Sequence, residues 1–250
     1  MYRIQCAEIW GGIRDLEQDV CSSGVRASLY SSACEGCKGG DIYYLSVCES
    51  DKLTRIAVAD VLGHGEAVSE YSQFIYDALK LYMNEPVDAK VLTEVNRHAL
   101  SRGLKAMTTA AIVSFYRSTS HLCFTYAGHY PVLVKRKRDH NWLDAMVKEP
   151  DDADRFDTNL PLAVKSNAVF VQENMPLAKG DRLFLYTDGI IEAPDHSDDL
   201  FGIDRLRDVL EDQANAPLHE LRDSVLDSLI KHTGGDLRHD DVTFLAVEIL

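Results

Sequence analysis

The sequence has no long apolar run. No stretch approaches the roughly 20 predominantly apolar residues that a membrane-spanning helix requires. The first ten residues, MYRIQCAEIW, lack a basic segment followed by an apolar one, so they do not indicate a secretory signal. Basic residues are also scarce, since 26 Lys and Arg face 40 Asp and Glu, which gives a net charge of −14. Such a charge repels nucleic-acid backbones and anionic membrane surfaces. We therefore expect a cytoplasmic protein that binds neither nucleic acid nor a membrane.

Closely spaced cysteine pairs are nearly absent as well. The six cysteines include a single CxxC pair, Cys34 and Cys37, with no further Cys or His pair at the spacing of a structural zinc site. Free and mostly buried thiols are therefore expected.

Basic residues gather at one place in the sequence, Lys135 to Arg138. This run is short and follows a strand-like apolar segment. We interpret it as the solvated end of a hairpin rather than as a binding patch.

Short runs rich in Val, Ile, Tyr, Phe and Thr predict strands, and apolar residues at helical spacing predict helices. The predicted strands are 42–48, 53–60, 109–116, 121–127, 132–137, 168–173, 181–187 and 242–249. The predicted helices are 66–83, 86–104, 203–213 and 218–232.

The order of these elements predicts the fold class. Strand pairs followed by helix pairs do not give the alternation of a parallel α/β fold. We expect an α+β fold, a four-layer α-β-β-α sandwich of two antiparallel sheets flanked by helix pairs. Residues 1–250 would form one domain, in which 1–38 contributes an N-terminal strand or a regulatory segment. The acidic stretch 149–157 is expected to be a solvated loop.

Aspartates recur in four short motifs that are marked by glycines or by paired acids. They are Asp41 in GGDIYY, Asp60 in IAVADVLGHG, Asp188 in LFLYTDGIIE, and Asp240 with Asp241 in RHDDVTFLAV. If these acids are gathered in one place, their charges repel unless cations neutralise them. The motifs therefore favour a site for hard divalent metals, and with it water activation and phosphate chemistry.

Each motif also has a purely structural interpretation. Asp41 could close a tight turn, and Asp60 could cap backbone amides where a strand leads into a helix. Asp188 could form a type I turn with the following glycine. His64 could bind a phosphate oxygen, protonate a leaving group, or be a satisfied turn residue.

The order of the motifs is more specific than any one of them. The succession GGD, DxxGHG, AGHYP, TDG and DDxT resembles the metal-dependent phosphatases of the PPM, or protein phosphatase 2C-like, family. The resemblance extends from about Gly39 to the C-terminus and includes Asn96, the MTTAAIVSFY strand and the NLPLAV segment. It is closest to the bacterial sporulation and stress-response branch, which acts on partner-switching regulators.

The resemblance implies a centre of two divalent ions, Mn²⁺ or Mg²⁺, at one end of a β-sandwich. Asp60 matches the aspartate that bridges the two metals, and the Val61 carbonyl matches the backbone ligand beside it. Asp188 and Asp240 match ligands of one ion, and Asp41 matches a residue that supports the other. The residues that match supporting positions are Gly40, Gly63, Gly189 and Asp241.

The same resemblance assigns the chemistry to Asp60, Asp188 and Asp240, with His64 as an additional candidate. His129 of AGHYP is expected to be structural because a short turn follows it. The phosphate-binding arginine of eukaryotic members has no clear match here. The candidates are Arg14, Arg26 and Lys38.

The predicted function is therefore that of a metal-dependent protein serine/threonine phosphatase. A hydroxide that bridges two metals would hydrolyse phosphoserine or phosphothreonine on a regulatory protein resembling an anti-sigma-factor antagonist. The alternative is a weak or inactive pseudophosphatase that binds partners in signalling. A homodimer is compatible with either function.

Overall fold

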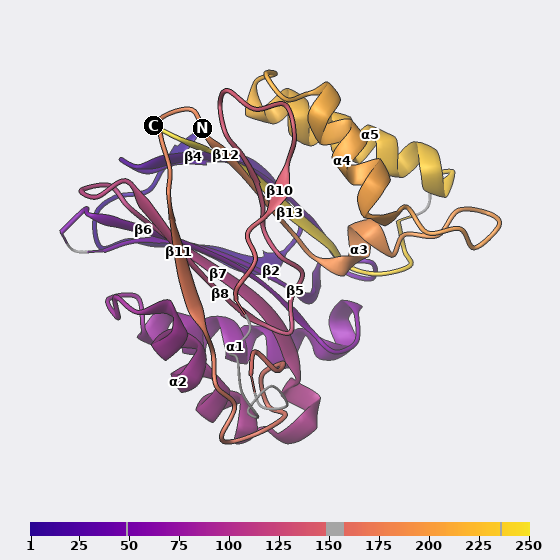
Figure 1. The fold of residues 1–250 in the computed structure, drawn as a ribbon. Coiled ribbons are helices and arrows are strands. Elements are labelled where there is room, and N and C mark those ends of the chain that lie inside the picture. The colour runs from indigo at the N-terminus through magenta and orange to yellow at the C-terminus, as the bar shows by residue number, and fades with distance from the viewer. Residues whose placement is uncertain (49, 149–157, 236) are drawn as a thin grey trace.

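Two β-sheets packed face to face form the centre of the protein (Figure 1). The computed structural model describes residues 1–48, 50–148, 158–235 and 237–250, so the acidic stretch 149–157 lies outside the described residues. The strand order is β1-β3-β4-β13-β12-β9-β10 in the seven-stranded sheet and β11-β8-β7-β6-β5-β2 in the six-stranded sheet. Every pairing is antiparallel except that of β1 with β3.

The bounds of the elements are as follows. The strands are β1 Tyr2–Arg3, β2 Ile9–Arg14, β3 Leu16–Cys21, β4 Val25–Ser32, β5 Lys38–Val47, β6 Leu53–Val61, β7 Thr108–Tyr116, β8 His121–Ala127, β9 Leu133–Lys135, β10 Leu143–Asp144, β11 Gln172–Pro176, β12 Arg182–Tyr186 and β13 Val242–Ile249. The helices are α1 Ser69–Leu81, α2 Asp88–Leu100, α3 Asp188–Ile191, α4 Gly202–Asp212 and α5 Leu218–Thr233, with 3₁₀ turns η1 Gly65–Val68 and η2 Gly103–Ala106.

Alternating side chains on the central strands produce the layers. Successive residues of a strand point to opposite faces. On β5, Tyr43 and Leu45 therefore pack into the core between the sheets, whereas Ile42 and Tyr44 pack against the helices. Both faces of β5 are thus buried, which explains its long apolar run.

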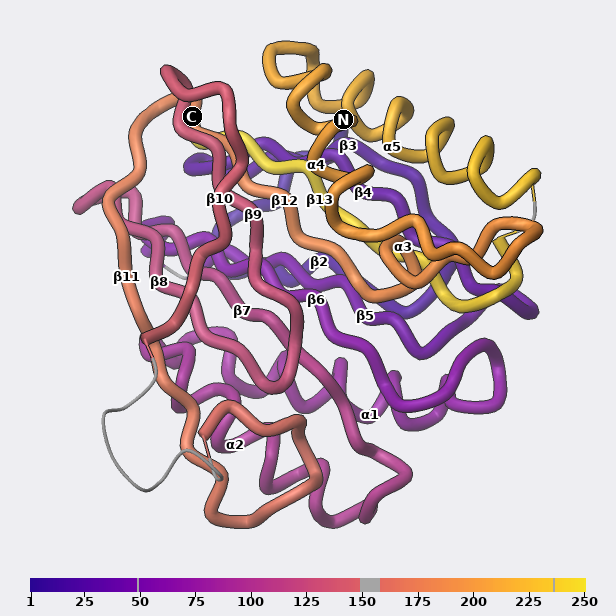
Figure 2. The backbone as a smooth tube through the Cα atoms, turned by 45° about the vertical axis from the view of Figure 1, so that its right-hand side comes forward, coloured from indigo at the N-terminus to yellow at the C-terminus, as the bar shows by residue number. Residues whose placement is uncertain are grey.

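One pair of helices covers the outer face of each sheet, as Figures 1 and 2 show. Helices α1 and α2 share an apolar cluster with the six-stranded sheet, and α4 and α5 share one with the seven-stranded sheet. This arrangement confirms the predicted four-layer sandwich. Within the described part of the chain, no helix is long and apolar enough to cross a membrane.

The structure corrects the predicted elements in two regions. Residues 2–32, for which an N-terminal strand or a regulatory segment was expected, form the four strands β1 to β4, and these contribute to both sheets. The predicted strand 168–173 was placed too early, because the ladder of β11 with β8 begins at Gln172. Ala168 and Phe170 instead pack into the apolar cluster beneath α1 and α2.

Candidate metal centre

The first two carboxylates of the site lie opposite each other on neighbouring strands. Asp41 is the cross-strand partner of Asp60 in the β5–β6 ladder, and side chains of such partners lie on the same face of the sheet. That face is the inner one, because Tyr43 and Val58, two residues from Asp41 and Asp60, belong to the core between the sheets. Asp41 is 3% exposed and Asp60 is partly buried. The ladder therefore directs two carboxylates into one end of the layer between the sheets.

The third carboxylate comes from the other sheet. β12 ends at Tyr186, and Asp188 begins α3 two residues later. Between them, the buried Thr187 donates its hydroxyl to Oδ2 of Asp41 at 2.7 Å. The backbone N–H of Thr187 also bonds the carbonyl of Thr243. Thr187 thus joins the two sheets and fixes the position of the Asp41 carboxylate.

The two acids before β13 have different surroundings. The Asp241 carboxylate is buried, and its Oδ1 accepts the N–H of Cys34 at 2.8 Å. Its Oδ2 accepts the N–H groups of Gly40 and Gly65 at 2.5 and 2.9 Å. Asp240 is only partly buried, and its Oδ1 accepts the N–H of Asp241 at 2.7 Å. Asp241 is therefore occupied in holding three backbone segments together, whereas Asp240 is more accessible.

Glycines lie where these segments approach most closely. A Cβ on Gly189 would be 1.9 Å from the carbonyl oxygen of Asp241. A Cβ on Gly40 would be 2.9 Å from the carbonyl oxygen of Gly63 and 3.0 Å from that of Val61. Gly63 has a φ of +102°, which favours glycine. The structure therefore places Gly40, Gly63 and Gly189 at close backbone contacts around the carboxylates.

The acids of the site raise one another's pKa. Burial, followed by the charges of the neighbouring acids, raises the pKa of Asp60 to about 10. Burial and then the charge of Asp240 raise the pKa of Asp188 to about 6. Burial also raises the pKa of Asp41 and Asp240, to which the charge of Asp241 adds in both cases. Among the described residues, no Lys or Arg forms an ion pair with these acids. In the described part of the chain, the site therefore gathers mutually repelling acids to which no Lys or Arg is paired.

This set of donors fits a hard divalent cation. The side-chain donors at this end of the sandwich are carboxylate oxygens, which suit Mg²⁺ and Mn²⁺. In the described part of the chain, no three His, Cys, Asp or Glu side chains lie close enough together to bind one metal ion as they stand. The carboxylates are thus near enough to repel but have not converged. A bound divalent cation would relieve this repulsion.

Comparisons with known proteins identify the family. The profile described as "Stage II sporulation protein E (SpoIIE)" matches residues 50–250. The chain belongs to the SpoIIE family. Its resemblance to the bacterial branch of the protein phosphatase 2C-like enzymes is thereby confirmed.

Two curated relatives of this SpoIIE-family chain come from Bacillus subtilis (strain 168). It is 23% identical to the phosphoserine phosphatase RsbP over 228 residues, which cover 89% of this chain and 51% of RsbP. It is 26% identical to the phosphoserine phosphatase RsbU over 208 residues, which cover 82% of this chain and 58% of RsbU. The chain therefore spans about half the length of these relatives.

Solved structures show the same fold. The SiaA-PP2C domain of Pseudomonas aeruginosa has a TM-score of 0.74 and 21% identity, covering 89% of this chain and 85% of that one. The catalytic domain of the serine/threonine protein phosphatase PstP, solved in complex with two manganese ions, has a TM-score of 0.61 and 14% identity. That match covers 91% of this chain and 99% of PstP.

The remaining sequence candidates occupy different places in this SpoIIE-family chain. His64 is exposed, and its Nδ1 lies 3.2 Å from Sγ of Cys34. His129 has two buried ring nitrogens with no partner among the described residues, and burial lowers its pKa to about 4. Arg26 pairs across the sheet with Glu248, near the end of β13 that lies away from the carboxylates. Its candidacy as the phosphate ligand of this site is therefore wrong.

Two residues of the site were not predicted from the sequence. Thr187 lies directly before Asp188 in the motif YTDG, so a hydroxyl near the carboxylates could have been anticipated. Cys34 contributes its backbone N–H to Asp241. Nothing in the sequence indicates that contact, because it depends on how the loop after β4 folds against β13.

Proposed function

We propose that this chain is a metal-dependent protein serine/threonine phosphatase acting on phosphoserine or phosphothreonine of a regulatory protein. Its SpoIIE family and its similarity to two proteins named phosphoserine phosphatase support this proposal. The observation that carries it is that Asp41, Asp60, Asp188 and Asp240 lie at one end of the sandwich and raise one another's pKa, with no Lys or Arg of the described residues paired to them. Divalent ions held by such oxygen ligands could activate a water for direct attack on phosphorus, so that no covalent intermediate is needed.

The proposed ligands divide by their surroundings. Burial and then the acids of both sheets raise the pKa of Asp60, which would contact two ions, together with the Val61 carbonyl. The partly exposed Asp188 and Asp240 would hold one ion, and Asp41 would support the other. Bound divalent ions supply activation of water and neutralisation of phosphoryl oxygens. The same proposal takes these ions to be two Mn²⁺ or Mg²⁺, in line with the two manganese ions of PstP.

Other residues of the chain would hold these ligands in place. The Thr187 hydroxyl fixes one oxygen of Asp41. Asp241 fixes the backbone at Gly40, within β5, and at Gly65, just after β6, and so positions the strand ends that carry Asp41 and Asp60. Asp241 would therefore be a positioning residue, and His64 would lie at the edge of the site. This rigidity matters because the water and the phosphoryl group must be aligned in the reaction.

The wider biological setting belongs to the same proposal. The phosphorylated partner would resemble an anti-sigma-factor antagonist, the location would be the cytoplasm, and the chain could act as a homodimer. Residues 1–250 would form one phosphatase domain. The strands in residues 2–32 complete both sheets, which supports a structural role for 1–38.

A pseudophosphatase is the alternative function. The presence of all four aspartates at one end of the sandwich disfavours it. A protein that needed only to bind a partner would gain stability by losing such mutually repelling acids.

The test is phosphate release from a phosphoserine protein or peptide in the presence of Mn²⁺ or Mg²⁺. Asp60→Asn, Asp188→Asn and Asp240→Asn should each lower kcat/KM by about two orders of magnitude or more, because several kcal/mol of transition-state stabilisation would be lost. Asp208→Asn, at an exposed position on α4, is the matched control and should leave the rate unchanged. Metal binding without turnover in the unsubstituted protein would favour the pseudophosphatase.

A further inference from the structure

A basic pocket lies at the end of the seven-stranded sheet opposite to the carboxylates. Its cationic lining residues come from β4, β9, β12 and the neighbouring loops: Arg26, Lys135, Lys137, Lys179 and Arg182. One acidic side chain, Glu248 on β13, lines it as well. Five cationic side chains against one acidic side chain and, in the sequence given, the α-carboxylate of Leu250 leave this pocket net positive in a chain whose net charge is −14.

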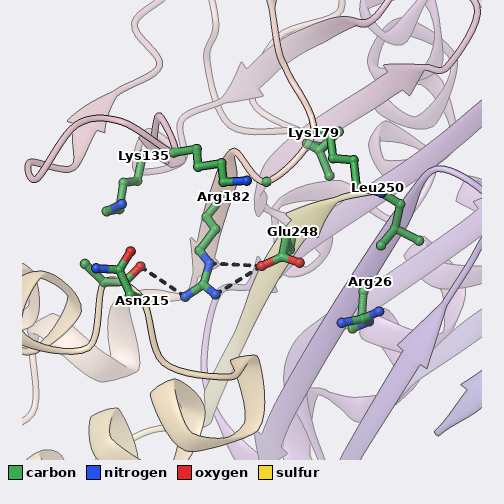
Figure 3. Close-up of a pocket in the computed structure, with 11 residues that line it drawn as sticks. Arg26, Lys135, Lys179, Arg182, Asn215, Glu248 and Leu250 are labelled. Atoms are coloured by element: carbon green, nitrogen blue, oxygen red, sulfur yellow. Dashed lines mark hydrogen bonds and ion pairs between the residues drawn. The ribbon is translucent and has the colours of Figure 1, made fainter.

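The strand register explains how the charges gather. Arg26 is paired with Glu248, Glu248 with Arg182, and Arg182 with Lys135 across adjacent strands. These four residues form a row across the sheet on the face toward α4 and α5. Phe184, two residues from Arg182 and therefore on the same face, belongs to the apolar cluster that includes those helices. Figure 3 shows Arg182 between Glu248 and the Asn215 loop, with Arg26 beyond Glu248.

Lys135 is the most informative member of this row. Its side chain is 3% exposed, and its ammonium makes one long hydrogen bond, at 3.4 Å, to the carbonyl of Arg136. Burial, followed by the charge of Arg182, lowers the pKa of Lys135, and the charges of Asp139 and Asp181 offset this only in part. It forms no ion pair within the described part of the chain. A buried ammonium without a carboxylate partner is costly unless a ligand supplies the opposite charge. The prediction of a solvated hairpin end is therefore wrong for Lys135, whereas Lys137 and Arg138 are exposed.

The other cations differ in how many hydrogen bonds and ion pairs they form within the protein. The Arg182 guanidinium bonds Oε2 of Glu248 at 3.0 and 3.3 Å and the carbonyl of Ala214 at 3.2 Å, so it is largely satisfied. Arg26, Lys137 and Lys179 form no ion pair with any described residue. The Lys137 side chain passes directly over Gly180, where an added Cβ would lie 2.8 Å from its Cδ. Four cations thus remain for a ligand.

We propose that this pocket binds a compact, multiply charged phosphate anion of the pyrophosphate class. The free cations outnumber the carboxylates of the pocket, and a guanidinium together with several ammonium groups suits phosphate oxygens. The pocket holds about 320 Å³, at the small end for ligand sites. No aromatic side chain among its lining residues offers a surface for stacking a nucleobase. The charge and size therefore favour a small polyanion over a nucleotide.

This site is separate from the metal centre. Arg182 and Asp188 lie at opposite ends of β12, six residues apart, which corresponds to about 20 Å along a strand. Substitutions in the pocket therefore leave the carboxylates untouched, and the proposal does not depend on the phosphatase activity.

The experiment is calorimetric titration of the whole chain with pyrophosphate and with orthophosphate, in the presence of a metal chelator. Without metals, the acids of the metal centre repel phosphate, so heat of binding reports the basic pocket. Pyrophosphate should bind more tightly than orthophosphate, and the affinity should fall as salt is added.

Three variants separate binding from folding. Lys137→Gln and Lys179→Gln change exposed side chains and should each weaken binding by about five- to tenfold. Lys135→Gln should weaken it at least as much, with thermal unfolding checked first because this residue is buried. Glu248→Gln should tighten binding by a similar factor, since it removes the one acidic side chain of the lining while keeping an acceptor for Arg182. Lys231→Gln, on the exposed end of α5, is the control.

Two results would overturn the proposal. One is the absence of binding heat at millimolar pyrophosphate in low salt, or binding that none of the pocket variants changes. The other is binding to vesicles that carry anionic phospholipid headgroups without any binding of soluble pyrophosphate, which would make the pocket part of a membrane contact instead.

Discussion

Replacing Asp60 by Asn should stabilise the metal-free protein while removing its response to metals. In the folded chain the pKa of Asp60 is raised from 3.8 to about 10 by burial and by its acidic neighbours. The folded state therefore keeps a proton that the unfolded state releases above about pH 4. The contribution of this proton to the stability of the folded state is therefore fully present below about pH 4 and is lost as the pH rises toward the folded-state pKa.

The magnitude follows from the size of this shift. For each pH unit between the two pKa values, the free energy of unfolding falls by about 1.4 kcal/mol. At pH 7 the metal-free wild type would thus be destabilised by up to about 4 kcal/mol through Asp60 alone. The Asn side chain has the same shape and does not titrate, and Asp60 forms no ion pair with a described residue that the substitution would break.

The assay is urea denaturation, followed by circular dichroism, at several pH values between 5 and 8 with a chelator and then with Mn²⁺. In chelator at pH 7 the variant should be more stable than the wild type, and its stability should depend less on pH. Saturating metal should stabilise the wild type by about 2.7 kcal/mol at 100 times Kd, and the variant by much less. Asp208→Asn is the control for a surface acid. A variant that is equal to or less stable than the wild type in chelator would refute the reasoning.

Two further substitutions test the scaffold, with the free energy of unfolding as the measurement. Gly189→Ala should cost about 2–3 kcal/mol, because its Cβ would overlap the Asp241 carbonyl. The control Gly103→Ala should cost about 1–2 kcal/mol, because its φ is +69° but its Cβ would meet nothing within 4 Å. Equal costs would contradict the close approach of Gly189 to Asp241. Arg55→Met should cost about 3–5 kcal/mol, because it removes the ion-pair partner that lies 2.9 Å from the fully buried Asp88. Adding Asp88→Leu should recover much of this loss. Failure of the double variant to recover stability would show that the bonds from Arg55 to the carbonyls of residues 82, 83 and 85 matter more than the ion pair.

The layered fold could be predicted because its central strands are strongly apolar. β6 and β7 are buried on both faces and read as strands without tertiary information. The strands in residues 2–32 could not be predicted in the same way. β2 contains two adjacent glycines, which have low strand propensity, and it is a strand because it pairs with β5.

The acids of the candidate site could be proposed from sequence motifs, but their positions relative to one another could not. Flanking glycines and strand ends indicate Asp41, Asp60 and Asp188, but the sequence does not state that Asp41 and Asp60 are direct cross-strand partners. That relation is fixed by the register of a hairpin. The burial of Lys135 was missed for a related reason, since a basic run gives no sign that one member faces the helix layer.

The position of β13 has a consequence for how the protein is made. It comes last among the described strands, yet it lies between β4 and β12 in the middle of its sheet. The residue just before it, Asp241, bonds the N–H groups of Cys34, Gly40 and Gly65, which are 207, 201 and 176 residues earlier in the chain. A nascent chain on the ribosome therefore cannot assemble the carboxylate cluster until residues 240–249 have emerged. Synthesis itself would delay any activity of the site until nearly the entire sequence described is available to fold.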